Sequence, residues 1–475
     1  MKLSTGLLDP YIPAPSRPWN KRLITHLLGR TTFGAKVSDV NSLLSFTPGE
    51  CVDLLFQSLP LPEPPGTWIT DPPNYQDPQN GQRMRALPYW WLKVIYQQPV
   101  SFRERMTFFW HNHFTSEGTV VKIPQHMYIQ NTLFRTNAFG NFKNLTKQVT
   151  RDPAMLYYLD GRLSTVNNPN ENYSRELLEL FTIGIGHYTE TDVQEGARAL
   201  TGWIINGLTS QFIPNRHDNG QKTFLGQTGN FDDEDIADII FSQHQTAITF
   251  CTKIYRNFIN QKEDMSYAMP VINEMADMLR SNDYELEPLL KTILKSQLFF
   301  SENVINSIYK SPVEVFLSAV RQMNITLNVI NLNAHFRYIS TESSTAGQLL
   351  FFPPNVQGWK GFRDWLNTLT LPVRSSFLES IITGLKKDNT PTGFSVDPLA
   401  FANSFTNPND AVLLVDQMCE HLVRHKLSAK QKSSLLLVLL DGSEIYDWSI
   451  NDPEAPSRIL KFLKAVMYMA EYQLT

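Results

Sequence analysis

Two histidines separated by one residue are the first candidates for chemistry in this sequence. His111 and His113 lie in the run Trp110-His111-Asn112-His113-Phe114, where a helix that begins near Ser101 is expected to end. In an extended segment, side chains two residues apart point to the same side, and two such imidazoles can share one metal ion. The alternative is that both histidines cap carbonyl groups or pack between aromatic rings. A nuclease reading of His-Asn-His lacks the hairpin motif and the basic DNA-binding face that it needs.

A second candidate is a charged stripe on a helix that is expected to begin at Pro169. Glu171, Arg175 and Glu179 are spaced by four residues and therefore share one helix face, while Glu176 points at a different angle. The stripe is typical of a ladder of surface ion pairs. In a partly buried position, its carboxylates could instead bind a metal or move a proton, with Arg175 orienting them.

A third candidate is the polar segment Arg216-His217-Asp218-Asn219-Gly220, followed by Lys222. A neighbouring histidine and aspartate in a loop can supply a metal ligand or a general base. Asp-Asn-Gly is also a good turn sequence, so the segment has a purely structural explanation. The sequence leaves the two alternatives open.

Composition and missing motifs exclude several classes of protein. The chain has 475 residues, with 42 Lys plus Arg against 46 Asp plus Glu, and shows no basic block of the kind that nucleic-acid binders carry. It has no GxSxG elbow, no P-loop, no GxGxxG and no HExxH, so no nucleotide cofactor is expected. Cys51, Cys251 and Cys419 lie too far apart in sequence to suggest a disulfide framework.

The N-terminus and the apolar runs give expectations about localisation. No apolar segment follows Met1, so we expect no signal peptide, and the longest apolar run, residues 435–440, is far below the roughly 20 residues of a membrane span. The protein is therefore expected in the cytoplasm, or exported together with a partner.

The elements that must position these residues are predicted to be mainly helical. Helix-start signals, a capping residue followed by proline or by a glutamate three positions on, recur at residues 47–50, 101–104, 152–153, 168–169 and 311–312. Residues 203–212, with Asn206-Gly207 between apolar runs, predict one short β-hairpin. The expected architecture is a large multi-helix globular body with long irregular loops and a C-terminal helical subdomain.

Domain organisation follows from the loops. Seven prolines in residues 60–81 predict a rigid loop that wraps over the surface, anchored by Trp68 and Tyr75. The polar, turn-rich residues 386–408 suggest a boundary. We therefore expect a main helical body at residues 1–385 and a C-terminal helical subdomain at residues 386–475 packed on it.

Several segments together resemble a bacterial family known as domain of unknown function 1800, over nearly the whole chain. The resemblance rests on LLGRTTFG at 27–34, FWHNHF at 109–114, NENYSRELLEL at 170–180, ARALTGW at 197–203, HD at 217–218, KTFLG at 222–226, KSPVE at 310–314 and PPNVQGW at 353–359. It implies a mainly helical protein and brings no established activity. Members of the family are often encoded beside a phosphatase- or sulfatase-like protein, domain of unknown function 1501, which implies a partner of that kind.

The polar residues of these motifs define two hypotheses. In the first, the motifs converge on a metal-dependent, hydrolase-type site that holds Zn, Fe or Mn. Glu171 and Arg175 would be its catalytic residues. Its metal ligands would be His111, His113, Glu176, His217 and Asp218. In the second, the chain is a non-catalytic partner or scaffold protein that acts with the phosphatase-like neighbour in export or cell-envelope polysaccharide handling. Aromatic residues expected at the surface, Trp68, Trp90, Trp91 and Trp359, favour the second hypothesis. A metal site predicts convergence on one open pocket, and a structural network predicts buried side chains paired with backbone groups.

Overall fold

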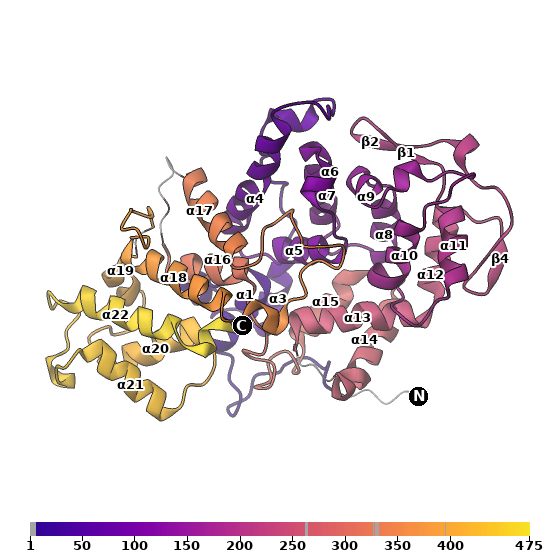
Figure 1. Ribbon diagram of the computed structural model, residues 1–475. Coiled ribbons are helices and arrows are strands. Elements are labelled where there is room, and N and C mark those ends of the chain that lie inside the picture. The colour runs from indigo at the N-terminus through magenta and orange to yellow at the C-terminus, as the bar shows by residue number, and fades with distance from the viewer. Residues whose placement is uncertain (1–5, 262–264, 326, 328–331, 395) are drawn as a thin grey trace.

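Helices make up most of the molecule in the computed structural model, which describes residues 6–261, 265–325, 327, 332–394 and 396–475. The predicted mainly α-helical architecture is confirmed (Figure 1). No helix in these ranges is both long enough and apolar enough to cross a bilayer. The three cysteines are free and buried.

Helices occur throughout the described ranges. The first half of the chain contains α1 (Lys21–Thr31), α2 (Val37–Leu43), α3 (Pro48–Leu55), α4 (Asn80–Gln97), α5 (Arg103–His113), α6 (Gly118–Val121), α7 (Pro124–Thr136), α8 (Phe142–Thr150), α9 (Pro153–Tyr158), α10 (Glu171–Glu176) and α11 (Glu190–Ala199). Its second half contains α12 (Asp233–Ser242), α13 (His244–Phe258), α14 (Met269–Ser281), α15 (Leu286–Lys295), α16 (Pro312–Gln322), α17 (Leu332–Thr345), α18 (Thr370–Thr383), α19 (Pro398–Asn403), α20 (Ala411–Val423), α21 (Ala429–Leu440) and α22 (Ala455–Met467). In Figure 1, α19 to α22 gather at the end of the molecule opposite α10 to α12 and the strands.

Two small hairpins interrupt the helices. The predicted hairpin is confirmed: β1 (Trp203–Asn206) pairs antiparallel with β2 (Thr209–Phe212). A second hairpin, β3 (Lys222–Phe224) with β4 (Gln227–Gly229), was not predicted. Its turn residues Leu225 and Gly226 both have positive φ, at 45° and 81°, and Leu-Gly lacks the usual asparagine or aspartate signal for such a turn.

Most of the predicted helix caps form. Thr47 and Glu50 make a capping box at α3, Ser311 and Glu314 make one at α16, and Asp152 caps α9. The cap predicted at residues 168–169 is wrong by two positions, because Asn170 caps α10 and the helix begins at Glu171.

The predicted capping box at residues 101–104 is also wrong. Ser101 Oγ does accept the Arg103 N–H at 3.2 Å, but Glu104 turns inward instead of reaching back to the cap. Its carboxylate accepts from Arg135 Nε at 2.7 Å and Nη2 at 2.9 Å, and from Trp91 Nε1 at 2.8 Å. This fully buried ion pair ties α4, α5 and α7 together.

Apolar side chains form two core clusters. The first gathers residues between Leu8 and Ile305, and the second joins residues from α4 and α16 to those of α18, α20 and α22. The expectation of exposed tryptophans is wrong for Trp90, Trp91 and Trp359, which are only 8%, 0% and 7% exposed. Residues 386–475 share the second cluster with α16 and α18, and the division of the chain into a body at 1–385 and a subdomain at 386–475 stays a prediction.

Two aromatic residues of the proline-rich segment contact the helices. Trp68 packs half-buried against the second cluster, with the Arg83 guanidinium 5.6 Å from its ring centroid. Tyr75 stacks on Tyr157 at 5.4 Å. These contacts fix the segment to the helices rather than leaving it as a linker.

Replacing Glu104 should strongly destabilise the fold. Glu104→Gln removes the charge that neutralises the buried Arg135, and breaking one side of a buried pair costs about 3–5 kcal/mol. Urea denaturation would measure the loss. The control Glu171→Gln disrupts an exposed pair with Arg175 (3.1 Å) and should cost less than about 1 kcal/mol. Equal effects of the two substitutions would contradict a structural role for Glu104.

Candidate functional site

The two histidines lie in the last turn of α5, not in the expected extended segment. Helix α5 runs through both residues to His113. Successive residues of a helix rotate by about 100°, so side chains two positions apart point away from each other. His111 contacts Trp91 and Phe351, whereas His113 contacts Phe109 and Phe250. The idea that their shared direction would create a metal site is therefore wrong.

His111 holds a loop in place. Its Nε2 accepts the Phe351 backbone N–H at 3.0 Å, and its ring meets Trp91 edge-on at 5.1 Å. Burial lowers the pKa of His111 from 6.5 to about 3, so the ring is neutral and can accept this hydrogen bond. Because the unfolded chain binds the proton more tightly, acidification from about pH 6.5 towards pH 3 removes stability.

His113 lies beside a half-buried lysine, Lys253. Its Nδ1 is 3.3 Å from Lys253 Nζ, and Lys253 also donates to the Leu180 carbonyl. Burial, and then the Lys253 charge, lower the pKa of His113 well below its usual value, and burial lowers the pKa of Lys253 to about 8. The pair joins α5 to α13 and to the π-helical turn Leu177–Phe181.

The residue between the histidines, Asn112, was not singled out in the sequence. Its Oδ1 accepts the Trp359 N–H at 2.8 Å, and its Nδ2 donates to the Trp359 carbonyl at 3.2 Å. The preceding Gly358 has φ +71°, and a Cβ there would lie 2.3 Å from Asn112 Oδ1. The glycine before a tryptophan in PPNVQGW was the available signal for this close approach.

The acidic stripe behaves as a surface ladder over only part of its length. Arg175 pairs with Glu171 at 3.1 Å and with Glu190, and all three side chains are more than a third exposed. The π-helical turn breaks the four-residue spacing, and Glu179 instead accepts the Tyr188 hydroxyl at 2.9 Å. Glu176 is half-buried, and burial followed by the Glu179 charge raises its pKa.

His217 and Asp218 fasten the loop before β3 to α11. His217 Nδ1 lies 3.0 Å from the Thr201 carbonyl, and the Asp218 carboxylate accepts from Arg198 at 2.7 and 3.2 Å. Hydrogen bonding to Arg198 is the main reason that the pKa of Asp218 is lowered. Lys222 donates to the Asp218 carbonyl at 2.5 Å. The Asp-Asn-Gly turn also forms, since Asp218 Oδ1 accepts the Gly220 N–H at 2.8 Å.

The candidate residues thus lie in separate groups. His111, with Asn112, holds the 351–359 segment, and His113 lies beside Lys253. Glu171 and Arg175 form a surface ladder, and His217 and Asp218 hold the β3 loop. Among the residues that the structure describes, no three histidine, cysteine, aspartate or glutamate side chains are grouped so that they could hold a metal ion. The described donor set does not fit a resident metal, and direct measurement decides the metal that the sequence predicted.

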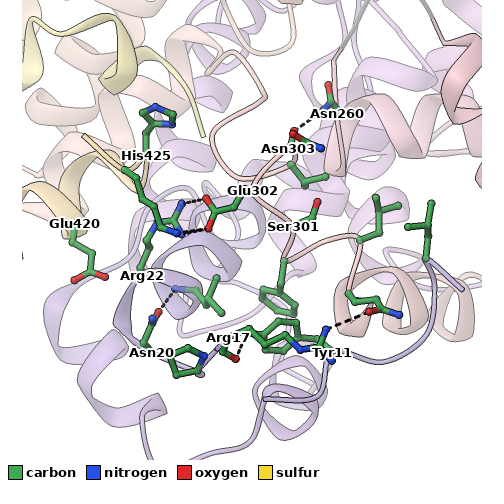
Figure 2. A pocket seen from close by; sticks show the side chains of 18 of the residues that line it. Tyr11, Arg17, Asn20, Arg22, Asn260, Ser301, Glu302, Asn303, Glu420 and His425 are labelled. Atoms are coloured by element: carbon green, nitrogen blue, oxygen red, sulfur yellow. Dashed lines mark hydrogen bonds and ion pairs between the residues drawn. The ribbon is translucent and has the colours of Figure 1, made fainter. Parts of the chain in front are cut away.

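A cavity of about 990 Å³ opens between the N-terminal residues, the 297–304 loop and α20 (Figure 2). Glu302 lies at its centre and accepts from Arg22 Nη1 at 2.9 Å and Nη2 at 2.7 Å, while Lys426 lies 2.9 Å away. Hydrogen bonding to Arg22 lowers the pKa of Glu302 to about 2. The single Glu302 carboxylate thus pairs with two cations, Arg22 from α1 and Lys426 from the segment after α20, and connects these two parts of the chain.

Replacing Gly358 by alanine should destabilise the fold more than the same replacement at Gly347. Gly347 also has positive φ, at +93°, but a Cβ there meets nothing within 4 Å. Both alanine variants carry the conformational strain of about 1–3 kcal/mol, and only Gly358→Ala also displaces Asn112. We expect a clearly lower melting temperature for Gly358→Ala. Equal melting temperatures would show that the close contact with Asn112 is unimportant.

Elemental analysis of the purified, metal-supplemented protein tests the metal prediction. Because no ligand group is assembled, we expect far less than one equivalent of Zn, Fe or Mn per chain, with no change in a His111→Ala, His113→Ala variant whose fold is checked by circular dichroism. One equivalent of metal in the unmodified protein that the variant lacks would support the metal site.

Comparison with known proteins places the chain in a family. A family model described as "Protein of unknown function (DUF1800)" matches residues 26–474. The same comparison found no curated protein and no solved structure that matches the chain. The matched range includes every segment on which the resemblance rests. Asn112 joins two of these segments, 109–114 and 353–359, and Asp218 contacts Arg198 in a third. The chain belongs to the DUF1800 family of proteins of unknown function.

Proposed function

We propose that this chain is a non-catalytic scaffold protein that acts with a phosphatase- or sulfatase-like partner encoded beside it, in export or cell-envelope polysaccharide handling. The observation that carries the proposal is the use of the family's polar residues. His111, Asn112 and Asp218 each bind another segment of the same chain.

Such contacts support a structural role for these residues. A catalytic acid, base or nucleophile must reach a substrate, which requires an open pocket and an available polar atom. His111 and His113 are only 2% and 6% exposed and are enclosed by aromatic rings. Their burial favours a network that fixes loop positions over a reaction centre.

The C-terminal helices offer a surface for the partner. Leu437 on α21 is 70% exposed, and Tyr446, in the short helix Ile445–Asp447, is 84% exposed. Exposed apolar side chains also occur on α20, at Val412 and Leu413. Apolar surface of this kind is typical of protein–protein contacts, and the proposal places the partner here rather than at the tryptophans.

Co-purification with the partner tests the proposal. We expect the tagged chain to retain the co-expressed phosphatase-like neighbour, and a Leu437→Lys, Tyr446→Ser variant to lose at least ten-fold of it. The control Ile185→Lys changes an equally exposed apolar residue (73%) at a different site and should retain the partner.

Two results would contradict the proposal. One is failure of the unmodified chain to retain the neighbour. The other is hydrolysis of phosphate, sulfate or carboxylate esters by the purified chain alone, with the activity abolished in a folded His111→Ala variant. That result would show that the chain is an enzyme.

A further inference from the structure

A second large cavity lies along α4, between the proline-rich segment and α17. Its volume is about 950 Å³. Helices α4 and α17 lie side by side (Figure 1) and form two of its sides, and the third is made by the prolines at positions 60, 62, 64 and 65. We call this cavity the α4 groove.

The α4 groove is positively charged in a chain whose net charge is −4. Arg85, Lys93, Arg103 and Arg337 line it, against the single carboxylate of Glu63. Within the described part of the chain, no carboxylate forms an ion pair with Arg85, Lys93 or Arg337. Cations gathered without counter-charges repel one another, so an anionic ligand would be attracted to them.

The proline wall is held rigidly against α4. Arg103 Nη1 donates to the carbonyls of Leu59 at 2.6 Å and Pro60 at 2.9 Å. Trp90 Nε1 donates to the Glu63 carbonyl at 2.7 Å. The groove is therefore preformed, which reduces the entropy cost of binding.

Gln98, at the end of α4, brings an unused amide to the groove. The residue is 8% exposed, and neither its Nε2 nor its Oε1 has a hydrogen-bond partner. Its backbone N–H bonds the Val94 carbonyl, which fixes its position at the helix end. Leaving a buried donor and a buried acceptor unpaired is unfavourable, and a ligand hydroxyl can satisfy either of them.

The shape and chemistry of the walls select the class of ligand. Proline has no backbone N–H, so the proline wall lacks the donors with which a sheet edge would pair a bound peptide strand. The proline rings instead present flat apolar faces, and beside them the Arg337 guanidinium lies over the half-buried Tyr89 ring, 5.7 Å from its centroid. A pyranose ring offers C–H groups on its face and hydroxyls on its rim, and a uronic acid adds a carboxylate.

We propose that the α4 groove binds an acidic oligosaccharide. Its carboxylates bind Arg85, Lys93 and Arg337, a hydroxyl binds the Gln98 amide, and its sugar rings lie on the prolines. The inference rests on the proposed function for its setting in polysaccharide handling. Its test uses the purified chain alone, so it can fail while the partner is still retained, and the reverse.

Isothermal titration calorimetry of the full chain with tetragalacturonic acid tests the inference. We expect saturable binding that weakens at least ten-fold in Arg85→Gln, Lys93→Gln and weakens as salt is raised. The control Lys360→Gln, Lys430→Gln removes the same charge from exposed positions outside the groove and should bind as the unmodified chain does. Neutral maltotetraose should bind at least ten-fold more weakly than the acidic sugar.

Gln98→Leu separates binding from folding. The substitution removes an unpaired buried amide, so the melting temperature should be unchanged or higher while tetragalacturonic acid binds several-fold more weakly. A variant that loses stability and binds normally would contradict the role of Gln98.

Three further results would overturn the proposal. They are absence of tetragalacturonic acid binding, equal weakening in the control variant, and tighter binding of hexaglutamate than of the sugar. The last result would identify the occupant as an acidic peptide.

Discussion

The architecture depends on the hydrogen bonds between the C-terminal end of α5 and the loop at residues 351–359. At the last turn of α5, Asn112 binds both backbone groups of Trp359, and His111 accepts the Phe351 N–H. These bonds bring a segment some 240 residues away in sequence onto the helix. The segment joins α17 to α18, which contribute to the second core cluster, so the same contact links the two halves of the molecule.

Burial makes these polar contacts specific. An unpaired polar group in a low-dielectric interior is costly, so a buried donor strongly favours the one arrangement that satisfies it. The neutral His111 accepts the Phe351 N–H. The buried Glu104 carboxylate is compensated by Arg135, with Arg103 3.6 Å away, and accepts a hydrogen bond from Trp91. The same residue types at a surface would be hydrated and would fix nothing. The polar motifs of this chain therefore join helices and loops to one another.

Local signals in the sequence predicted much of the fold. Caps at Thr47, Asp152 and Ser311 and the Asn206-Gly207 hairpin depend on neighbouring residues alone, and each is confirmed. The failures arise where tertiary contacts decide. Glu104 leaves its expected cap for a partner 31 residues away, and α5 continues through His113 because both histidines find buried contacts.

The candidate site was harder to predict for the same reason. Spacing identified His111 and His217 as unusual but could not show which segments they would face. Asn112 went unnoticed because its partner lies 247 residues away, and only Gly358 in the partner segment hinted at a close approach. The α4 groove combines residues from three distant segments, so no single stretch of sequence indicates it.

Native-state hydrogen exchange at the Phe351 and Trp359 amides tests the central claim most directly. If the end of α5 holds this segment, both amides are protected in the unmodified protein. Asn112→Ala then selectively exposes Trp359, and His111→Ala selectively exposes Phe351, while the α16 and α18 amides stay protected. Rapid exchange of both amides in the unmodified protein, or no change in either variant, would contradict the account.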